Sequence, residues 1–217
     1  MTVLNYAQAA SWFRKAADQG DAGAQYNLGV HYANGQGVPQ DYAQAASWFR
    51  NAADQGDAGA QYNLGALYAH GQGVPQDYAQ AASWNRKAAD QGNAGAQYNL
   101  GLGYANGQGV PQDYAQAASW YRKAADQGYA GAQFGLGALY DNGQGVPQDY
   151  AQAASWYRKA ADQGVAGAQN NLGMLYYKGQ GVPQDSAQAE YFFEKAAAQG
   201  DQDAARNLRI LRTGSAQ

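Results

Sequence analysis

Apolar side chains follow a helical pattern that is broken at regular intervals along the chain. Between residues 60 and 69, Leu64 and Leu67 fall at spacings typical of one buried helix face. Asp57 precedes this segment as a candidate N-cap, and residues 71–75, with two glycines and a proline, follow it. The pattern therefore predicts a helix from about residue 60 to residue 69.

A second helical pattern follows and is richer in alanine. It starts at Asp77, with Gln80 three residues on in the spacing of a capping box, and ends at Gly92. Alanine, glutamine and lysine in this segment have high helix propensity. The two segments together predict a helix-loop-helix hairpin and an all-α fold class.

The hairpin recurs with a period of 36 residues. Segments 41–76 and 77–112 differ at only 6 of their 36 positions. A fixed period of this length predicts an α-solenoid, in which each unit buries its apolar face against its neighbours. We expect one domain over residues 1–217. Its predicted parts are a leading helix at about 4–19, hairpins at 21–56, 57–92, 93–128, 129–164 and 165–200, and a C-terminal capping helix at about 202–212.

The repeat resembles a known family. Leu64-Gly65-x-x-Tyr68 followed by Ala81-x-x-x-Asn85 is similar to the tetratricopeptide pattern, although the period is longer. The loop Gly-Gln-Gly-Val-Pro-Gln and the segment Lys-Ala-Ala-Asp-Gln-Gly resemble the Sel1-like repeat, a relative of the tetratricopeptides. The resemblance covers about residues 5–200. It implies a right-handed α-solenoid that acts as an adaptor in bacterial or eukaryotic complexes.

Composition narrows the function further. The formal net charge is −3 with a pI near 5.2, which does not favour nucleic-acid binding. The chain has no cysteine, so disulfides and thiolate metal sites are excluded. It has no apolar run of about 18 residues and no signal-peptide pattern at its start. We expect a soluble monomer without membrane insertion, either cytoplasmic or periplasmic or secreted.

The repeats differ mainly in the first helix of each hairpin. The variable positions are spaced by four, three and one residues and fall on one stripe. In tetratricopeptide-like arrays this helix lines the concave groove, so the resemblance makes these positions candidates for binding a partner. They are Tyr26, Tyr62, Tyr98, Phe134, Asn170, Val30, Leu102, Met174, Asn34, His70, Asn106, Asp141, Asn142, Tyr177, Lys178, Tyr129 and Val165, and to them we add the recurring amides of Asn27, Asn63 and Asn99.

Each group of candidates has two interpretations. The aromatic series that begins at Tyr26 either contacts a bound peptide or packs between neighbouring first helices. The asparagine series that begins at Asn27 either bonds a peptide backbone or a neighbouring helix. Tyr129 and Val165 replace N-cap residues, which indicates either recognition concentrated in the fourth and fifth hairpins or neutral drift.

Two core positions are also unusual. Asn85 stands where other repeats have phenylalanine or tyrosine, and Gly103 stands where they have leucine. We assign both losses of packing to the third hairpin and expect it to be the least stable part of the array.

The sequence offers no catalytic, metal-binding or cofactor-binding residues. His31 and His70 occupy different positions of the repeat, so no paired metal spacing arises. The serine at position 11 of the chain recurs in four later repeats without a histidine in register. We predict a non-enzymatic scaffold that binds a protein or peptide along its concave face. The alternatives are a glycan or cell-wall binding module, or a consensus or designed array without a native partner.

Overall fold

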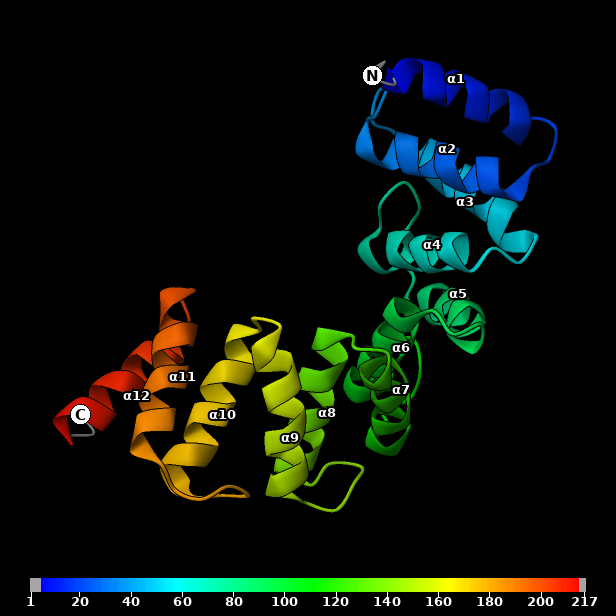
Figure 1. Cartoon of the computed structure of the whole chain (residues 1–217). Helices are drawn as coiled ribbons and strands as arrows, with labels where there is room; N and C mark the ends of the chain where they lie inside the picture. The colour runs from blue at the N-terminus through cyan, green and yellow to red at the C-terminus, as the bar shows by residue number, and fades with distance from the viewer. Residues whose placement is uncertain (1–4, 215–217) are drawn as a thin grey trace. The chain divides into compact units, whose positions relative to one another are not determined.

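A computed structural model describes residues 5–214, which form twelve α-helices and no β-strand (Figure 1). The helices are α1 (Tyr6–Ala17), α2 (Ala22–Asn34), α3 (Tyr42–Asp54), α4 (Ala58–His70), α5 (Tyr78–Asp90), α6 (Ala94–Asn106), α7 (Tyr114–Asp126), α8 (Ala130–Asn142), α9 (Tyr150–Asp162), α10 (Ala166–Lys178), α11 (Ser186–Ala198) and α12 (Gln202–Thr213). Equivalent helices begin 36 residues apart, so the predicted all-α repeat is confirmed. The predicted start of the leading helix at residue 4 lies outside the described residues.

The chain divides into two compact units, one ending at Gln112 and one beginning at Asp113. Within the first unit, each helix from α1 to α6 packs against the next helix along the chain. Within the second unit, the helices from α7 to α12 do the same, as Figure 1 shows. The single domain over residues 1–217 stays a prediction.

Local sequence signals set the helix ends. The Asp57 carboxylate accepts a hydrogen bond from the Ala60 N–H at 2.7 Å, and Gly71 ends α4 in the left-handed conformation with φ of 66°. Asp77 caps α5 by accepting from the Gln80 N–H at 3.0 Å. Within the described residues, the Gln80 side chain does not bond back to Asp77, so only half of the predicted capping box forms.

Small residues let the two helices of a hairpin approach closely. Leu28 of the Leu-Gly motif is fully buried, and a Cβ added at Gly29 would lie 2.7 Å from the Phe49 ring of α3. The same contact recurs in the second unit, where a Cβ at Gly137 would lie 2.7 Å from the Tyr157 ring of α9. The glycine of this motif is therefore needed because an aromatic ring of the second helix packs directly onto it.

Each hairpin loop packs onto the hairpin before it. Gly73 follows the end of α4 with φ of 69°. A Cβ at Gly73 would overlap the backbone carbonyl of Tyr42, the first residue of α3. The second glycine of the loop is therefore required by a contact between hairpins as well as by its positive φ.

Buried glutamines also join successive hairpins, a feature absent from the sequence-based predictions. The Gln61 amide donates to the Ala53 carbonyl at 3.1 Å, and its oxygen accepts from the Gln91 amide at 2.8 Å. Equivalent pairs of bonds form at Gln25, Gln133 and Gln169. Because the buried amide is bonded at both its nitrogen and its oxygen, it stabilises the contact rather than weakening it. The only signal in the sequence was that these glutamines never vary among the hairpins.

Two first helices lack a side-chain cap. Neither Tyr129 before α8 nor Val165 before α10 accepts a hydrogen bond from its helix start. Replacing either residue with aspartate is expected to raise the free energy of unfolding by about 1 kcal/mol. Urea denaturation measures the change. Asp57→Ala, which removes an existing cap, is the matched control and should lower the free energy of unfolding by a similar amount. Unchanged stability in both aspartate variants would contradict the prediction.

The last helix exchanges one polar pair for another. In an earlier repeat, Arg158 of α9 donates to the hydroxyl of Tyr176, 18 residues later. The equivalent residues at the end of the chain are Glu194 and Arg212, which form an ion pair. Arg212 also pairs with Glu190 at 2.6 Å. The contact between α11 and α12 is thus kept although both residue types change.

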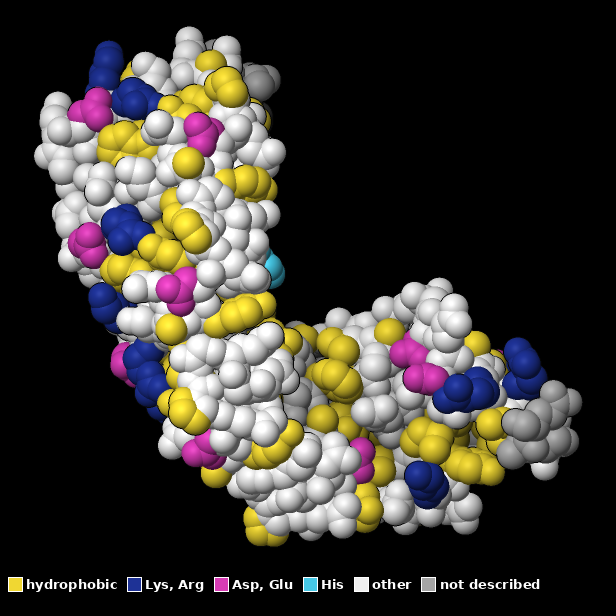
Figure 2. Space-filling view, turned by 180° about the vertical axis from the view of Figure 1, so that it is seen from behind, with side chains coloured by type: hydrophobic (Ala, Val, Ile, Leu, Met, Phe, Trp, Pro, Cys, Tyr) yellow, Lys and Arg dark blue, Asp and Glu magenta, His cyan; other side chains and the backbone are white. Residues whose placement is uncertain are grey.

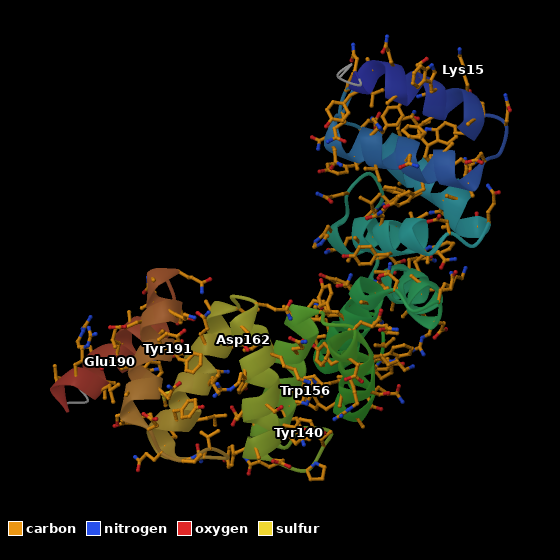
Figure 3. The ribbon with its side chains drawn as sticks, in the orientation of Figure 1. Lys15, Tyr140, Trp156, Asp162, Glu190 and Tyr191 are labelled. Atoms are coloured by element: carbon orange, nitrogen blue, oxygen red, sulfur yellow. The ribbon has the colours of Figure 1, made fainter. Side chains whose placement is uncertain are left out.

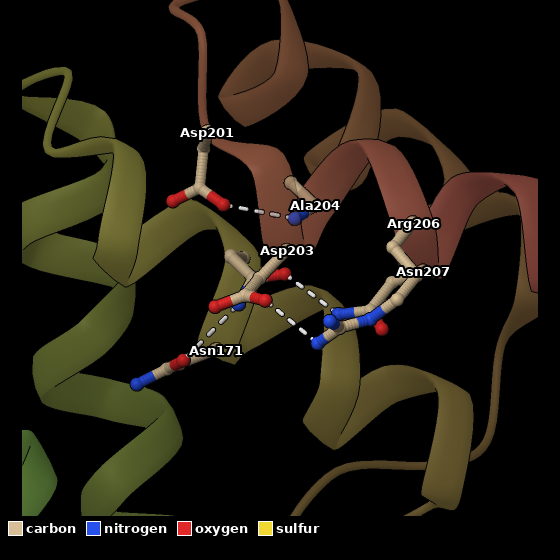
Figure 4. Close-up of polar contacts among 7 residues, drawn as sticks. Asn171, Asp201, Asp203, Ala204, Arg206 and Asn207 are labelled. Atoms are coloured by element: carbon tan, nitrogen blue, oxygen red, sulfur yellow. Dashed lines mark hydrogen bonds and ion pairs between the residues drawn. The ribbon is translucent and has the colours of Figure 1, made fainter.

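Polar contacts also fix the start of α12, as Figure 4 shows. Asp201 accepts from the Ala204 N–H at 2.8 Å, and Arg206 pairs with Asp203 at 2.6 Å. The Asn207 amide donates to the Asn170 oxygen of α10 at 2.9 Å. The exposed residues of α12 include Gln202, Asp203, Arg206, Arg209 and Arg212, so this helix has the polar outer surface that a capping helix requires.

Candidate interaction site

The predicted aromatic series lies half-buried between neighbouring first helices. The Tyr26 ring faces Gly59 of α4 and lies 6.0 Å from the Phe49 ring, measured between centroids. Phe134 in the second unit likewise faces Gly167 and lies 5.9 Å from Tyr157. These rings therefore contribute to packing between hairpins, and part of each remains accessible to solvent.

The asparagine series is less uniform. Asn27 donates to the Gly23 carbonyl of its own helix at 2.8 Å, and Asn171 donates to the Tyr157 hydroxyl at 3.2 Å. Within the described residues, the half-buried side chains of Asn63 and Asn99 form no hydrogen bond. Two amides in the first unit are therefore available to bond a ligand.

Gly135, which interrupts the asparagine series, lies close to an aromatic ring. A Cβ at this position would lie 3.0 Å from the Tyr121 ring of α7. An asparagine there would require a small shift of this ring, and the equivalent pair Asn171 and Tyr157 of the next repeat is accommodated with a hydrogen bond.

The remaining candidates separate by exposure. Asn34, His70, Asn106, Asn142, Tyr177 and Lys178 are exposed, whereas Val30, Leu102, Met174, Asp141, Tyr129, Val165, Tyr98 and Asn170 are half-buried. The exposed group lies at the last residues of the first helices, next to the loops. The half-buried group has enough surface to contact a partner and enough burial to be held in place.

A cavity of about 280 Å³ lies among α4, α5 and α6 in the first unit. Three of the predicted site residues, His70, Asn99 and Leu102, line it. The other lining residues are Ala66, Ala69, Gln76, Tyr78, Ala81, Ala82, Asn85, Leu100, Gly103 and Gln108. Positions that vary among the repeats thus converge on one cavity.

Two missing core side chains account for this cavity. Asn85 and Gly103, which replace an aromatic residue and a leucine, both line it. Asn85 lies on α5 of the second hairpin, so the assignment of both losses to the third hairpin was wrong. The Asn85 side chain is only 5 % exposed, and its Oδ1 atom is buried without a hydrogen-bond donor. An unpaired buried carbonyl destabilises its surroundings by about 1–3 kcal/mol.

The cavity predicts fast hydrogen exchange in α6. Amides in residues 94–106 are expected to exchange faster than the equivalent amides in 22–34, a helix that does not line the cavity, because helices with fewer buried contacts open more readily. Hydrogen exchange followed by mass spectrometry measures the difference. Equal protection of the two helices would contradict the prediction.

In the second unit, a tyrosine fills the equivalent space. The Tyr157 side chain is only 1 % exposed, and its hydroxyl donates to the Asp141 carboxylate at 3.1 Å. Burial, together with the negative charge of Asp141, raises the pKa of the Tyr157 phenol well above its ordinary value. Tyr157 therefore stays protonated and acts as a neutral packing and hydrogen-bonding group.

Cationic side chains of the second helices lie over aromatic rings of both first and second helices. The Arg122 guanidinium lies 5.6 Å from the Tyr140 ring centroid and 5.9 Å from that of Trp156, both labelled in Figure 3. The Lys159 ammonium lies 3.8 Å from the Trp156 ring. Figure 2 shows charges of both signs interspersed over the visible face. These cations serve packing within a helix and between successive hairpins, rather than forming one basic patch on that face.

The two histidines lie in different surroundings, since His31 is buried in α2 and His70 is exposed at the end of α4. His31 is buried, its Nδ1 lies 2.6 Å from the Gln36 carbonyl oxygen, and its ring lies 5.5 Å from the Phe13 ring. Among residues 5–214, no three histidine, cysteine, aspartate or glutamate side chains gather in a way that could hold a metal ion. Over the same range, every helix is too short or too polar to span a bilayer.

The chain is a helical-repeat protein whose first unit has a cavity among α4, α5 and α6. The Sel1 repeat profile matches residues 2–21, 22–57, 58–93, 94–129, 130–165 and 166–201. The chain therefore belongs to the Sel1 repeat family. Proteins of this family generally serve as protein-interaction scaffolds.

Solved structures support this assignment. The chain is 45% identical to c5321, a protective antigen of uropathogenic Escherichia coli, with a TM-score of 0.92 over 98% of this chain and 46% of that one. It thus spans about half the length of that relative. A Sel1 repeat protein from Oxalobacter formigenes is 32% identical, with a TM-score of 0.82 over 96% of this chain and 88% of that one. A search of curated proteins found no match to this chain.

Proposed function

We propose that this protein is a non-enzymatic scaffold that binds a peptide segment of a partner protein along its first helices, the predicted concave face. The observation that carries the proposal is the cavity among α4, α5 and α6, where residues that vary among the repeats converge. Invariant positions serve the stacking of the hairpins. A cavity lined by variable positions is instead suited to a specific partner.

The surroundings of the cavity support a peptide ligand. The unpaired amides of Asn63 and Asn99 lie one repeat apart and can bond the backbone groups of an extended segment. The half-buried rings of Tyr62 and Tyr98 offer apolar contact area that loses little conformational entropy on binding. Peptide-binding sites commonly combine such backbone bonding with pockets for individual side chains.

A double substitution tests this proposal. Asn63→Ala combined with Asn99→Ala is expected to abolish capture of a partner that the wild type retains in a pull-down followed by mass spectrometry. These side chains form no hydrogen bond in the protein, so the variant should remain folded. Ser47→Ala with Ser83→Ala, on the exposed face of the second helices, is the matched control and should retain the partner.

Equal capture by wild type and the asparagine variant would contradict the proposal. Binding in a glycan array, without capture of any protein, would favour the cell-wall alternative instead.

A further inference from the structure

The cavity occupies the place where the repeat pattern puts an aromatic ring. Asn85 is equivalent to Phe49 one repeat earlier and to Tyr157 two repeats later, and both of those rings are fully buried. Tyr157 therefore shows which chemical group these walls accommodate when the position is filled. At the equivalent position 157, this fold itself buries a phenol ring.

The partners of the Tyr157 hydroxyl identify what surrounds the equivalent point of the cavity. That hydroxyl accepts a hydrogen bond from Asn171 at 3.2 Å. The residue two repeats earlier is Asn99, which lines the cavity and forms no hydrogen bond within the described residues. The donor for a phenol oxygen is thus present although the phenol ring of the protein is missing.

An acceptor is present as well. Asp141, which accepts from Tyr157, is replaced by Ala69 at the cavity, but the buried Asn85 Oδ1 atom lacks a donor. Because the Oδ1 atom is itself buried, a ligand hydroxyl would donate to it once rotation of the Asn85 side chain turns this atom toward the cavity. The cavity thus combines one unpaired amide donor with one unpaired carbonyl acceptor.

The size and walls of the cavity suit an aromatic ring. Ala66, Ala81, Leu100 and Leu102 give it apolar sides, and its volume is about 280 Å³. Apolar cavities of about 150 Å³ already hold benzene in proteins. The cavity therefore has room for a substituted ring.

We propose that this cavity binds a phenol ring, supplied as the tyrosine side chain of the partner peptide; this source rests on the proposed function. The exposed residues His70, Gln76 and Gln108 form polar edges beside the apolar walls. Polar edges of this kind can bond the backbone on either side of an inserted side chain. The same face carries the half-buried Tyr62 and Asn63 of α4, so the ring and the flanking peptide would share one binding surface.

The probe for this site is p-cresol, which has the ring and hydroxyl of tyrosine without a backbone. In titrations followed by amide NMR, p-cresol is expected to bind the wild type saturably, with shifts at residues 85, 99 and 102. Toluene, which lacks the hydroxyl, should bind about fivefold more weakly, the value of one net hydrogen bond.

Two variants test whether p-cresol binds in the cavity rather than elsewhere on the surface. Asn85→Phe refills the cavity with the ring found at position 49 and is expected to abolish p-cresol binding while keeping the protein folded. Asn99→Ala should weaken p-cresol about fivefold but leave toluene unchanged. Asn63→Ala is the matched control and should bind p-cresol as the wild type does. Non-saturable binding, or equal binding by Asn85→Phe, would overturn the proposal.

The source of the ring is tested separately. N-acetyl-tyrosinamide and a tyrosine-containing peptide should bind at the same residues, and a phenylalanine peptide more weakly. Binding of p-cresol without binding of either tyrosine probe would overturn the tyrosine assignment in favour of a free small phenol. An empty pull-down together with specific p-cresol binding would reject the scaffold proposal but retain the phenol site.

Discussion

Replacing Gly73 with alanine is expected to lower the free energy of unfolding by about 3 kcal/mol or more, a large effect for a single methyl group. The positive φ at this position alone disfavours alanine by about 1–2 kcal/mol. The new Cβ would also overlap the backbone carbonyl of Tyr42, which cannot move without displacing the start of α3. Urea denaturation of the purified variant measures the loss.

Gly56→Ala is the matched control for this experiment. Gly56 also has a positive φ, of 97°, but a Cβ there would meet no atom within 4 Å. The control therefore reports backbone strain alone, and the difference between the variants reports the contact between loop and helix. If Gly73→Ala is no more destabilising than Gly56→Ala, the loop does not contribute to the stacking of hairpins.

The second large effect is expected when the residues at the equivalent positions 49 and 85 are exchanged. Phe49→Asn should lower the free energy of unfolding by about 3–5 kcal/mol, because it removes a fully buried ring. Asn85→Phe should raise it by about 1–3 kcal/mol, because it fills the cavity and removes an unpaired carbonyl. The ring fits against Gly29 in one hairpin, so it should also fit against Gly65 in the next.

Thermal and urea denaturation of both variants provide the measurement, and Asn85→Ala is the control for loss of the amide without filling of the space. A decrease in stability for Asn85→Phe would show that the cavity walls cannot accept a ring. That result would also count against the phenol site, since both depend on the same space.

These two exchanges imply that stability and binding compete at one position of the array. Aromatic residues at the equivalent positions complete the core in other hairpins, as Tyr121 and Tyr157 do. Asparagine at position 85 leaves the core open to a ligand. A scaffold can tolerate such a local loss because each hairpin is stabilised mainly by its nearest neighbours.

Much of the fold could be predicted from the sequence because its signals are local and repeated. Helix ends follow from capping residues such as Asp57 and from glycines such as Gly71, whose effects depend on a few neighbouring backbone groups. The period of 36 residues fixed the succession of hairpins, and it also revealed the unusual residues Asn85 and Gly103 by comparison with their equivalents.

The candidate site could be predicted only in part. Variation among the repeats identified His70 and Leu102, and the recurring asparagines identified Asn99; the structure brings all three to one cavity. It did not separate them from Tyr26, whose ring packs against Gly59, or from Asn27, which bonds its own helix. Position on a helix face is a local property, but exposure depends on how neighbouring helices cover that face.

The sequence by itself thus determined the class of fold, the repeat and the places where packing is lost. Only the tertiary structure decided how those places combine, as in the cavity shared by Asn85 and Gly103 from successive hairpins. It also revealed the bond from Gln61 to the Ala53 carbonyl and the contact of Gly73 with Tyr42. These contacts join different hairpins, and the spacing of residues within one repeat carries no information about them.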